Sequence, residues 1–295
     1  MTLKYKIIKF NTNEFGINIE SIKNEIPFEL LTWDLNDIKI SQLKLLIDLY
    51  PEEKKIILQE AQHYLDDELA PTTIHSTIIQ HLISRLPDED KKTFYAYKPF
   101  RKRSMSRFVA EYINNRWIVN NIELPELASF TQRADHPFDL RKLIRKFPPM
   151  ALATRHSPIL KVLIRNFLEI LCECESQKKP TKIEVTCHQM SLLIDGSIPS
   201  ACNSPEGLHQ DGSDYIVSAL VIDKYNIEGG TSQLYCAERK AFIQSHTLSA
   251  GEGLFHIDKN STIWHQVTPI TLKEPSIKIG YRNILGFDFN LISSL

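Results

Sequence analysis

The hydrophobic positions of the chain follow two different periods, one in each half. From about residue 35 to residue 175, apolar residues recur every three or four positions, the spacing that gives a helix one apolar face. Pro51, followed by acidic residues, predicts the start of one helix, and Ser157 before a proline predicts the cap of another. A further apolar stripe ends at Pro87 and consists of Ile74, Ile78, Ile79, Leu82, Ile83 and Leu86. We therefore expect a helical N-terminal part.

After Pro180 the period changes to that of β-strands. Short runs rich in β-branched and aromatic residues are separated by turns that contain Gly or Asn, with no helical segment between them. The runs are KIEVTCHQMSLLI, DYIVSALVID, TSQLYCA, GLFHI, STIWHQVTPI and SIKIGYRNILGFDFN. Many short strands in succession indicate a sandwich, barrel or jelly roll.

The expected fold class is therefore α+β, a cupin-like double-stranded β-helix (jelly roll) with a helical part packed on it. We place the mostly helical part at 1–178 and the jelly-roll catalytic core at 179–295, together forming one integrated domain.

Composition and charge exclude several classes of protein. The 295 residues are 42% hydrophobic and 24% charged, which is ordinary for a globular protein, and the net charge is −1. Such a balance gives no field that attracts nucleic acid, and no apolar run reaches the roughly 20 residues that span a bilayer. The N-terminus does not read as a signal peptide, and five cysteines without paired spacing argue against a disulfide framework. We expect a cytoplasmic protein that binds neither membranes nor nucleic acid; its oligomeric state is not encoded in any pattern we find.

The candidate chemistry lies in the segment PEGLHQDG. On an extended chain, His209 and Asp211 project from the same face, because residues two apart point the same way. An imidazole and a carboxylate at this spacing can occupy adjacent positions on a metal ion, and a distant histidine would complete a facial triad of two His and one carboxylate. His265 follows after a stretch long enough for several strands, and it is the last histidine of the chain. The sequence thus predicts a metal site formed by His209, Asp211 and His265.

A second His-x-Asp pair, His256 and Asp258, competes for this role. It leaves only a short spacer to His265 and no later histidine, so the first pair fits better. Arg282 follows on the next predicted strand, where its planar guanidinium could bind the distal acid group of 2-oxoglutarate through two hydrogen bonds. Two other classes stay open: a zinc or manganese isomerase or hydrolase in which Arg282 is structural, and a metal-free binding module. Iron-dependent formation of succinate from 2-oxoglutarate would distinguish an iron enzyme that uses this acid from both alternatives.

Four segments carry a resemblance to a known family. PEGLHQDGSDYIVSALVI, NIEGGTSQLY, LFHIDKNSTIWHQVTPI and GYRNILGFDF resemble bacterial 2-oxoglutarate/Fe(II)-dependent dioxygenases that hydroxylate free L-amino acids, of the L-isoleucine 4-hydroxylase type. The resemblance implies Fe(II), 2-oxoglutarate and O₂ as cofactor and cosubstrates, with succinate and CO₂ as products. It places the iron on His209, Asp211 and His265 and the 2-oxoglutarate on Arg282. The chain departs from many relatives at Met190 and Ser191, where an arginine is expected.

A free amino acid as substrate needs one cation and one anion near the iron. The candidate cations are Arg103 and Arg107 in the segment FRKRSMSRF, and the candidate anions are Glu206 and Asp214, beside the metal pair. Gln189, together with His188, lies on a strand that could line the barrel. Each has an ordinary alternative, such as a loop cap or a solvated charge. A carrier-bound or peptidyl amino acid also stays open as the substrate.

Overall fold

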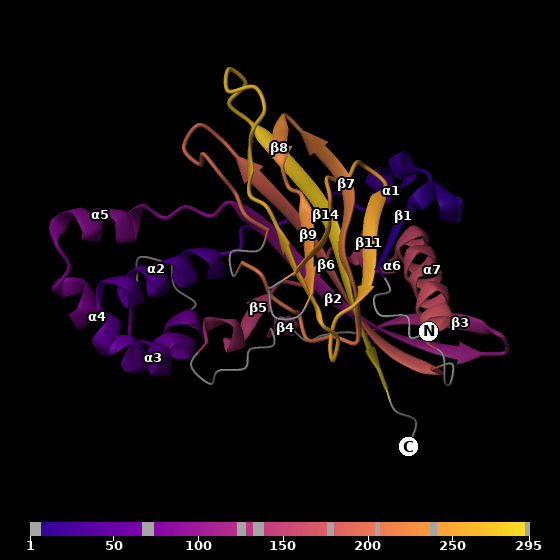
Figure 1. Ribbon diagram of the computed structural model, residues 1–295, viewed down its shortest axis with the longest axis horizontal. Helices are drawn as coiled ribbons and strands as arrows, with labels where there is room; N and C mark the ends of the chain where they lie inside the picture. Colours follow the sequence, from indigo (N-terminus) through magenta and orange to yellow (C-terminus); the bar gives the residue numbers. More distant parts are fainter. Residues whose placement is uncertain are drawn as a thin grey trace.

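The computed structural model describes residues 7–66, 74–122, 128–131, 139–175, 180–203, 207–236 and 241–292, and its centre is a large antiparallel sheet. Seven strands form this sheet in the spatial order β1-β11-β7-β14-β6-β2-β3 (Figure 1). Their bounds are β1 Ile7–Asn11, β2 Arg101–Ile113, β3 Arg116–Ile122, β6 Lys182–Ile194, β7 Tyr215–Tyr225, β11 Glu252–Ile257 and β14 Gly280–Leu291. The central strand β6 pairs with β14 on one side and with β2 on the other, so strands from both sides of residue 178 share one sheet.

A smaller sheet packs on part of the inner face of the large one. Its order is β10-β9-β12, with β9 at Ser232–Cys236, β10 at Ala241–His246 and β12 at Ile263–Val267. Two strand pairs extend the layers: β8 Ile227–Gly229 with β13 Ile270–Leu272, and β4 Ala128–Phe130 with β5 Arg145–Phe147. Apolar side chains of the two layers meet in a cluster that includes Met190, Leu234, Ile263 and Ile284. The predicted α+β class with a jelly roll of short strands is confirmed.

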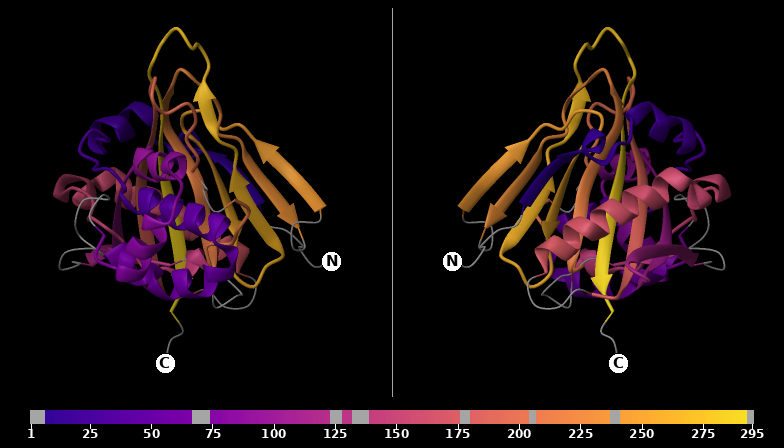
Figure 2. Two further views of the ribbon diagram at one scale, coloured as in Figure 1. Left: turned by 90° about the vertical axis from the view of Figure 1, so that its left-hand side faces the viewer. Right: turned by 90° about the vertical axis from the view of Figure 1, so that its right-hand side faces the viewer.

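Helices cover the outer face of the large sheet. In Figure 2 the helix α7 (Pro158–Cys174) crosses this face, and α1 (Ile19–Glu25) and α6 (Leu152–His156) pack against α7. Phe167 of α7 lies with its ring centroid 5.0 Å from that of Phe287 on β14, within the main hydrophobic core. Burial of each such side chain contributes about 1.5–3 kcal/mol relative to exposure. The predicted cap of this helix is present, since the Ser157 hydroxyl accepts a hydrogen bond from the Leu160 amide.

The remaining helices form a group to one side of the sheet (Figure 1, left). They are α2 Asn36–Leu49, α3 Lys54–Asp66, α4 Thr77–Ser84 and α5 Asp88–Ala96, and single 3₁₀ turns occur at Thr12–Phe15, Pro51–Glu53 and Leu140–Lys142. This group has a hydrophobic core of its own, around Leu43, Leu46, Ile57 and Phe94. No helix in the described part of the chain is long and apolar enough to span a membrane.

The expectation of helical structure between residues 35 and 175 is wrong for 101–122, where β2 and β3 lie, and for the short strands β4 and β5. On β2, alternate side chains point to opposite faces of the sheet. The buried inward side chains include Arg101 and Arg103, so the buried face of this strand is charged at its start. A hydrophobic period cannot reveal a strand that buries arginines, and the basic run therefore reads as a solvated surface.

Candidate metal centre

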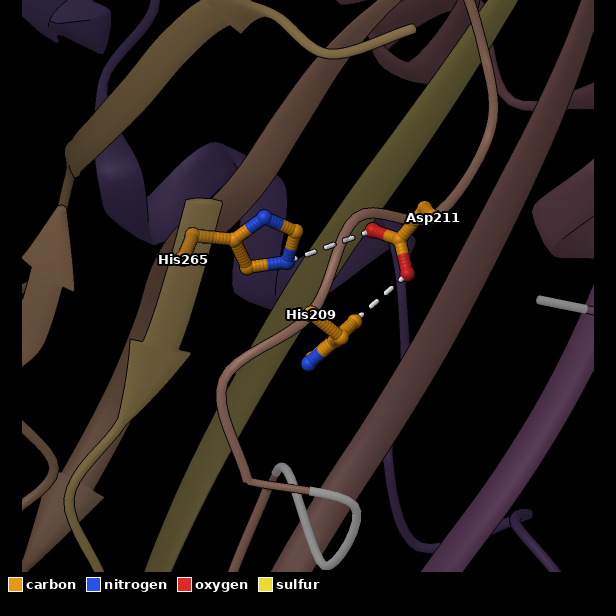
Figure 3. Close-up of side chains that lie close together, drawn as sticks. All are labelled: His209, Asp211 and His265. Atoms are coloured by element: carbon orange, nitrogen blue, oxygen red, sulfur yellow. Dashed lines mark ion pairs between the residues drawn. The ribbon is translucent and has the colours of Figure 1, made fainter. Parts of the chain in front are cut away.

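Two of the three predicted metal ligands face each other across a main-chain pairing. The amide of His209 donates to the carbonyl of His265 at 3.0 Å, and the amide of His265 donates back to the carbonyl of His209 at 3.0 Å. This antiparallel bridge joins the loop before β7 to strand β12 and places both imidazoles on the same side. Asp211, two residues after His209, turns its carboxylate toward both rings (Figure 3).

The side chains of His209, Asp211 and His265 converge closely enough to share one ion. One ligand atom from each lies within 4.8 Å of the others, and within the described residues this is the one group of three or more His, Cys, Asp or Glu side chains that does so. The Nε2 atoms of His209 and His265 lie 3.3 Å and 3.4 Å from the two carboxylate oxygens of Asp211. Both histidines are almost fully buried.

The hydrogen bonding of His209 favours a cation at this point. Its Nδ1 lies 2.7 Å from the carbonyl of Gly207, and because a carbonyl only accepts, Nδ1 must carry the proton. Nε2 of His209 and the carboxylate of Asp211 therefore need either a second proton or a metal ion between them. A metal ion there accepts a lone pair from each. The donor set of two imidazoles and one carboxylate thus fits a divalent transition metal.

Protonation states in the site agree with metal binding. Burial lowers the pKa of His265, which keeps its imidazole neutral and able to bind a metal. Burial alone would raise the pKa of Asp211, but the positive charge and hydrogen bonds that His265 and His209 supply when protonated outweigh burial and hold this pKa well below its usual value. A bound cation would have the same effect on the carboxylate. The carboxylate is therefore ionised at neutral pH.

The competing pair, His256 and Asp258, lies behind the ligands instead of joining them. The His256 ring centroid is 5.4 Å from that of His265, and burial lowers the pKa of His256 to about 3. One carboxylate oxygen of Asp258 accepts from the Gly212 amide at 2.6 Å, and the other lies 3.8 Å from Nδ1 of His265. Burial and the charge of Asp211 raise the pKa of Asp258 to about 8. Asp258 thereby supports the loop that carries Asp211.

Sequence reasoning missed Gln210, which points away from the ligands on either side of it. Its side-chain Nε2 lies within hydrogen-bond distance of three main-chain carbonyls, those of Asp258 at 3.0 Å, Ser261 at 3.2 Å and Ile263 at 2.8 Å, which share its two N–H donors. The alternation that projects His209 and Asp211 toward the ion turns Gln210 into the protein. It thereby ties the ligand loop to the segment that leads into β12.

Gln210→Ala is expected to lower the free energy of unfolding by about 1–3 kcal/mol, because buried carbonyls lose their donor. Urea unfolding of the metal-free protein measures the loss. Gln266→Ala is the matched control, since its amide makes one part-buried bond, to Gln233 at 2.8 Å, and should cost under about 1 kcal/mol. Equal losses in the two variants would contradict the role given to Gln210.

Arg282 is a buried cation on the inward face of β14. It is 2% exposed, and its Nη1 and Nη2 atoms have no hydrogen-bond partner within the described residues. Burial lowers its pKa to about 10, and the guanidinium still carries its charge at neutral pH. A Cβ atom at Gly230 would lie 3.2 Å from the Arg282 side chain, so only glycine leaves it this space. A buried and unsatisfied guanidinium fits an anionic ligand group. Arg282 is not among the side chains that line the cavity described next.

A cavity adjoins the triad, and its lining includes three arginines. Arg101 and Arg103 come from β2 and Arg145 from β5, while His188 and Asp288 come from β6 and β14. Arg101 is already neutralised, because it lies 2.5 Å from a carboxylate oxygen of Asp37 and 3.3 Å from one of Asp34.

The structure brings one of the five predicted substrate residues into this cavity, which is Arg103. Arg107 lies outside the lining and donates to the Ser129 carbonyl at 2.8 Å. Gln189 points to the opposite face of the sheet and donates to the Pro27 carbonyl at 2.9 Å. Asp214 accepts from the Leu291 amide at 2.8 Å, also outside the lining. Glu206 lies outside the described residues.

Comparison with known proteins identifies the family. Residues 80–288 match the model of the family described as 2OG-Fe dioxygenase. No curated protein matches the chain. The solved structure of a bsmA homolog from Methylobium petroleophilum PM1 is similar, with a TM-score of 0.54 and 17% sequence identity over 83% of this chain and 85% of that one. At such low identity, this likeness supports the fold alone.

Two further structures are similar at a lower level. IDO from Bacillus thuringiensis has a TM-score of 0.49 and 15% identity over 70% of this chain and 88% of its own. The Fe(II)/(alpha)ketoglutarate-dependent dioxygenase TqaL has a TM-score of 0.49 and 11% identity over 87% of this chain and 91% of its own.

Proposed function

This chain belongs to the 2OG-Fe dioxygenase family, and we propose that it hydroxylates an aliphatic side-chain carbon of a free L-amino acid. As a family member it is a non-haem iron dioxygenase that uses Fe(II), 2-oxoglutarate and O₂. The bound iron and cosubstrates supply the oxidising chemistry and release succinate and CO₂. The family assignment decides against the isomerase, the hydrolase and the metal-free binding module that the sequence left open.

We assign the iron to His209, Asp211 and His265. Two imidazoles and a carboxylate would hold the ion and would leave further positions on it for a cosubstrate and O₂. The main-chain bridge between His209 and His265 holds their backbones together, and the hydrogen bond that Nδ1 of His209 donates to the Gly207 carbonyl orients Nε2 of His209. The chain's own contribution is therefore to hold three donor atoms in place.

We assign the distal carboxylate of 2-oxoglutarate to Arg282. Its two terminal nitrogens form a fork that can donate two parallel hydrogen bonds to one carboxylate. Their lack of partners in the described part of the chain supports this role, as does the space that Gly230 leaves beside the side chain.

Arg282→Lys should raise the KM for 2-oxoglutarate about ten- to a hundredfold, because lysine keeps the charge but loses the fork. Steady-state kinetics with 2-oxoglutarate as the varied substrate measures the change. Lys224, whose pKa is lowered by burial and by the charge of Arg282, offers a nearby control. Lys224→Met should leave this KM within about threefold, since its ammonium donates to the Leu248 carbonyl. An unchanged KM in Arg282→Lys would show that another cation holds the cosubstrate.

The observation that carries the substrate assignment is the position of Arg103. This guanidinium is 5% exposed, lines the cavity that contains the triad, and forms no ion pair with a carboxylate in the described residues. Burial, with the nearby charges of Arg101 and Arg145, lowers its pKa to about 10. The free carboxylate of an amino acid would neutralise it, whereas a carrier-bound or peptidyl amino acid has no such group to offer.

The proposal is tested by supplying iron-loaded protein with 2-oxoglutarate, O₂ and each of the free L-amino acids in turn. We expect succinate above background with at least one of them, together with a product that has gained one oxygen atom. The same residue presented within a peptide or on a carrier thioester is the comparison. If the peptide or thioester is oxidised and no free amino acid is, the substrate assignment is overturned and the family assignment is left intact.

A further inference from the structure

Three buried polar side chains from neighbouring strands form a hydrogen-bonded chain along the cavity wall. Arg103 of β2 places Nη2 3.0 Å from Nδ1 of His188 on β6, and Nε2 of His188 lies 2.8 Å from Oδ2 of Asp288 on β14. All three line the cavity beside the metal triad. Strand register puts them there: Met105 opposes His188, Gly286 opposes His188 on its other side, and the chain runs across these three strands.

The direction of the hydrogen bonds follows from the chemistry of the partners. An arginine only donates, so Nδ1 of His188 must accept from Arg103. Nε2 then carries the proton and donates to the Asp288 carboxylate. His188 is thereby fixed as one tautomer between a cation and an anion, and each of these keeps hydrogen-bonding capacity for a ligand.

The guanidinium of Arg103, with its remaining hydrogen-bond donors, is held in a fixed plane. Its guanidinium carbon lies 4.1 Å from the ring centroid of Phe147 and 5.1 Å from that of Phe130, and its Nε has no partner in the described residues. Stacking of this kind fixes the orientation of the planar fork. Asp288 forms no ion pair with Lys or Arg in the described part.

We infer that Arg103 and Asp288 bind the two ends of a zwitterionic amino acid, the carboxylate on Arg103 and the ammonium on Asp288, with His188 as the positioning residue between them. This inference rests on the proposed function and adds the anion and the positioning residue to it. Asp288 takes the place expected for Glu206 or Asp214.

The groups that join the two charges are the same in number in the receptor and in the complex with a ligand. From Arg103 to Asp288 the protein offers two hydrogen bonds and one imidazole ring. A bound amino acid would also join the Arg103 guanidinium to the Asp288 carboxylate through two hydrogen bonds. Between these bonds would lie its own carboxylate and ammonium groups, which a single carbon connects. The charges are complementary as well, because a substrate with only anionic groups would be repelled by Asp288 and one with only cationic groups by Arg103.

The test measures binding instead of turnover. Protein loaded with Mn(II) and 2-oxoglutarate is titrated by calorimetry with each free L-amino acid, its N-acetyl derivative and its carboxamide. Wild-type protein should bind at least one free amino acid about ten- to a hundredfold more tightly than either derivative, since each derivative removes one charge-assisted contact.

Three variants assign the two ends. Asp288→Asn should abolish the preference for the free amino acid over its N-acetyl derivative, and Arg103→Gln the preference over its carboxamide. His188→Phe keeps a ring in place but should weaken both preferences together, an effect that a purely structural role would not produce. Arg107→Gln, on the same strand but outside the cavity lining, is the matched control and should keep both. The affinity for 2-oxoglutarate should stay unchanged in all four.

The outcomes separate this inference from the proposed function. Unchanged preferences in Asp288→Asn, or no binding of any free amino acid to the wild type, would overturn the inference. The wild type could bind a free amino acid selectively, and the variants could change that binding as expected, while no free amino acid gains oxygen. This result would support amino-acid binding by Arg103 and Asp288 and would overturn the proposed function. Hydroxylation of a free amino acid by Asp288→Asn, with an unchanged KM for that amino acid, would overturn the inference and support the proposed function.

Discussion

Asp211→Ala is expected to reduce iron-dependent succinate formation to the level of the iron-free protein. Asp211 is the one carboxylate in the proposed ligand set, and its two oxygens face the Nε2 atoms of both histidines. Without it two neutral imidazoles remain, which hold a divalent ion much more weakly than the full triad. Succinate is measured with a fixed excess of Fe(II), and bound iron is measured after gel filtration.

Two controls distinguish loss of the metal from loss of the fold. The thermal unfolding midpoint of metal-free Asp211→Ala should stay close to that of the metal-free wild type, because the main-chain bridge between His209 and His265 remains. His256→Gln alters the other His-x-Asp pair and should leave iron affinity within about threefold, since His256 lies outside the converging group. Wild-type succinate production by Asp211→Ala would remove the triad assignment, and loss of iron from His256→Gln would show that the wrong pair was chosen.

Arg101→Met is expected to lower the free energy of unfolding by about 3–5 kcal/mol, because it leaves two buried carboxylates without their cation. Arg101 donates to Asp37 from Nε at 3.0 Å and from Nη2 at 2.5 Å, and Asp34 lies 3.3 Å from the same Nη2. The three side chains are between 0% and 2% exposed, so water cannot compensate for the loss. Urea unfolding monitored by circular dichroism gives the free energy.

Arg107→Met is the matched control for this prediction. It makes the same chemical change on the same strand, at a half-buried position with a hydrogen bond to the Ser129 carbonyl. A loss of no more than about 1 kcal/mol is expected. If Arg101→Met costs as little, the buried ion pair does not hold the group of helices α2 to α5 against the sheet.

The convergence of His209, Asp211 and His265 could be predicted from the sequence because two of the three are placed by a local pattern. The two-residue period of an extended chain places His209 and Asp211 on one side, and His265 is the last histidine available. Helix boundaries marked by local signals were also predictable. Ser157 caps α7, and Pro51 begins the 3₁₀ turn that leads into α3.

Features that depend on strand register could not be predicted in the same way. Nothing local distinguishes Arg103 from Arg107, since both belong to one basic segment and both lie on β2. Only the pairing of β2 with β6 shows that one of them reaches the cavity. His188 and Asp288 acquire their partners across strand pairs as well. Asp288 did carry a signal, because it lies an even number of residues after Arg282 on a continuous strand.

The main-chain bridge between His209 and His265 has a consequence for which ion the protein takes up. Its two hydrogen bonds of 3.0 Å belong to the folded backbone, so the donor atoms stand at their separation before any ion arrives. A site that is already assembled before the ion binds cannot gain selectivity by folding around one particular metal. The intrinsic ranking of divalent ions then applies, and it places cobalt, copper and zinc above iron. Catalytic competence is therefore decided by which ion the surroundings supply, and a preparation that has met zinc should need a chelator before iron can restore it.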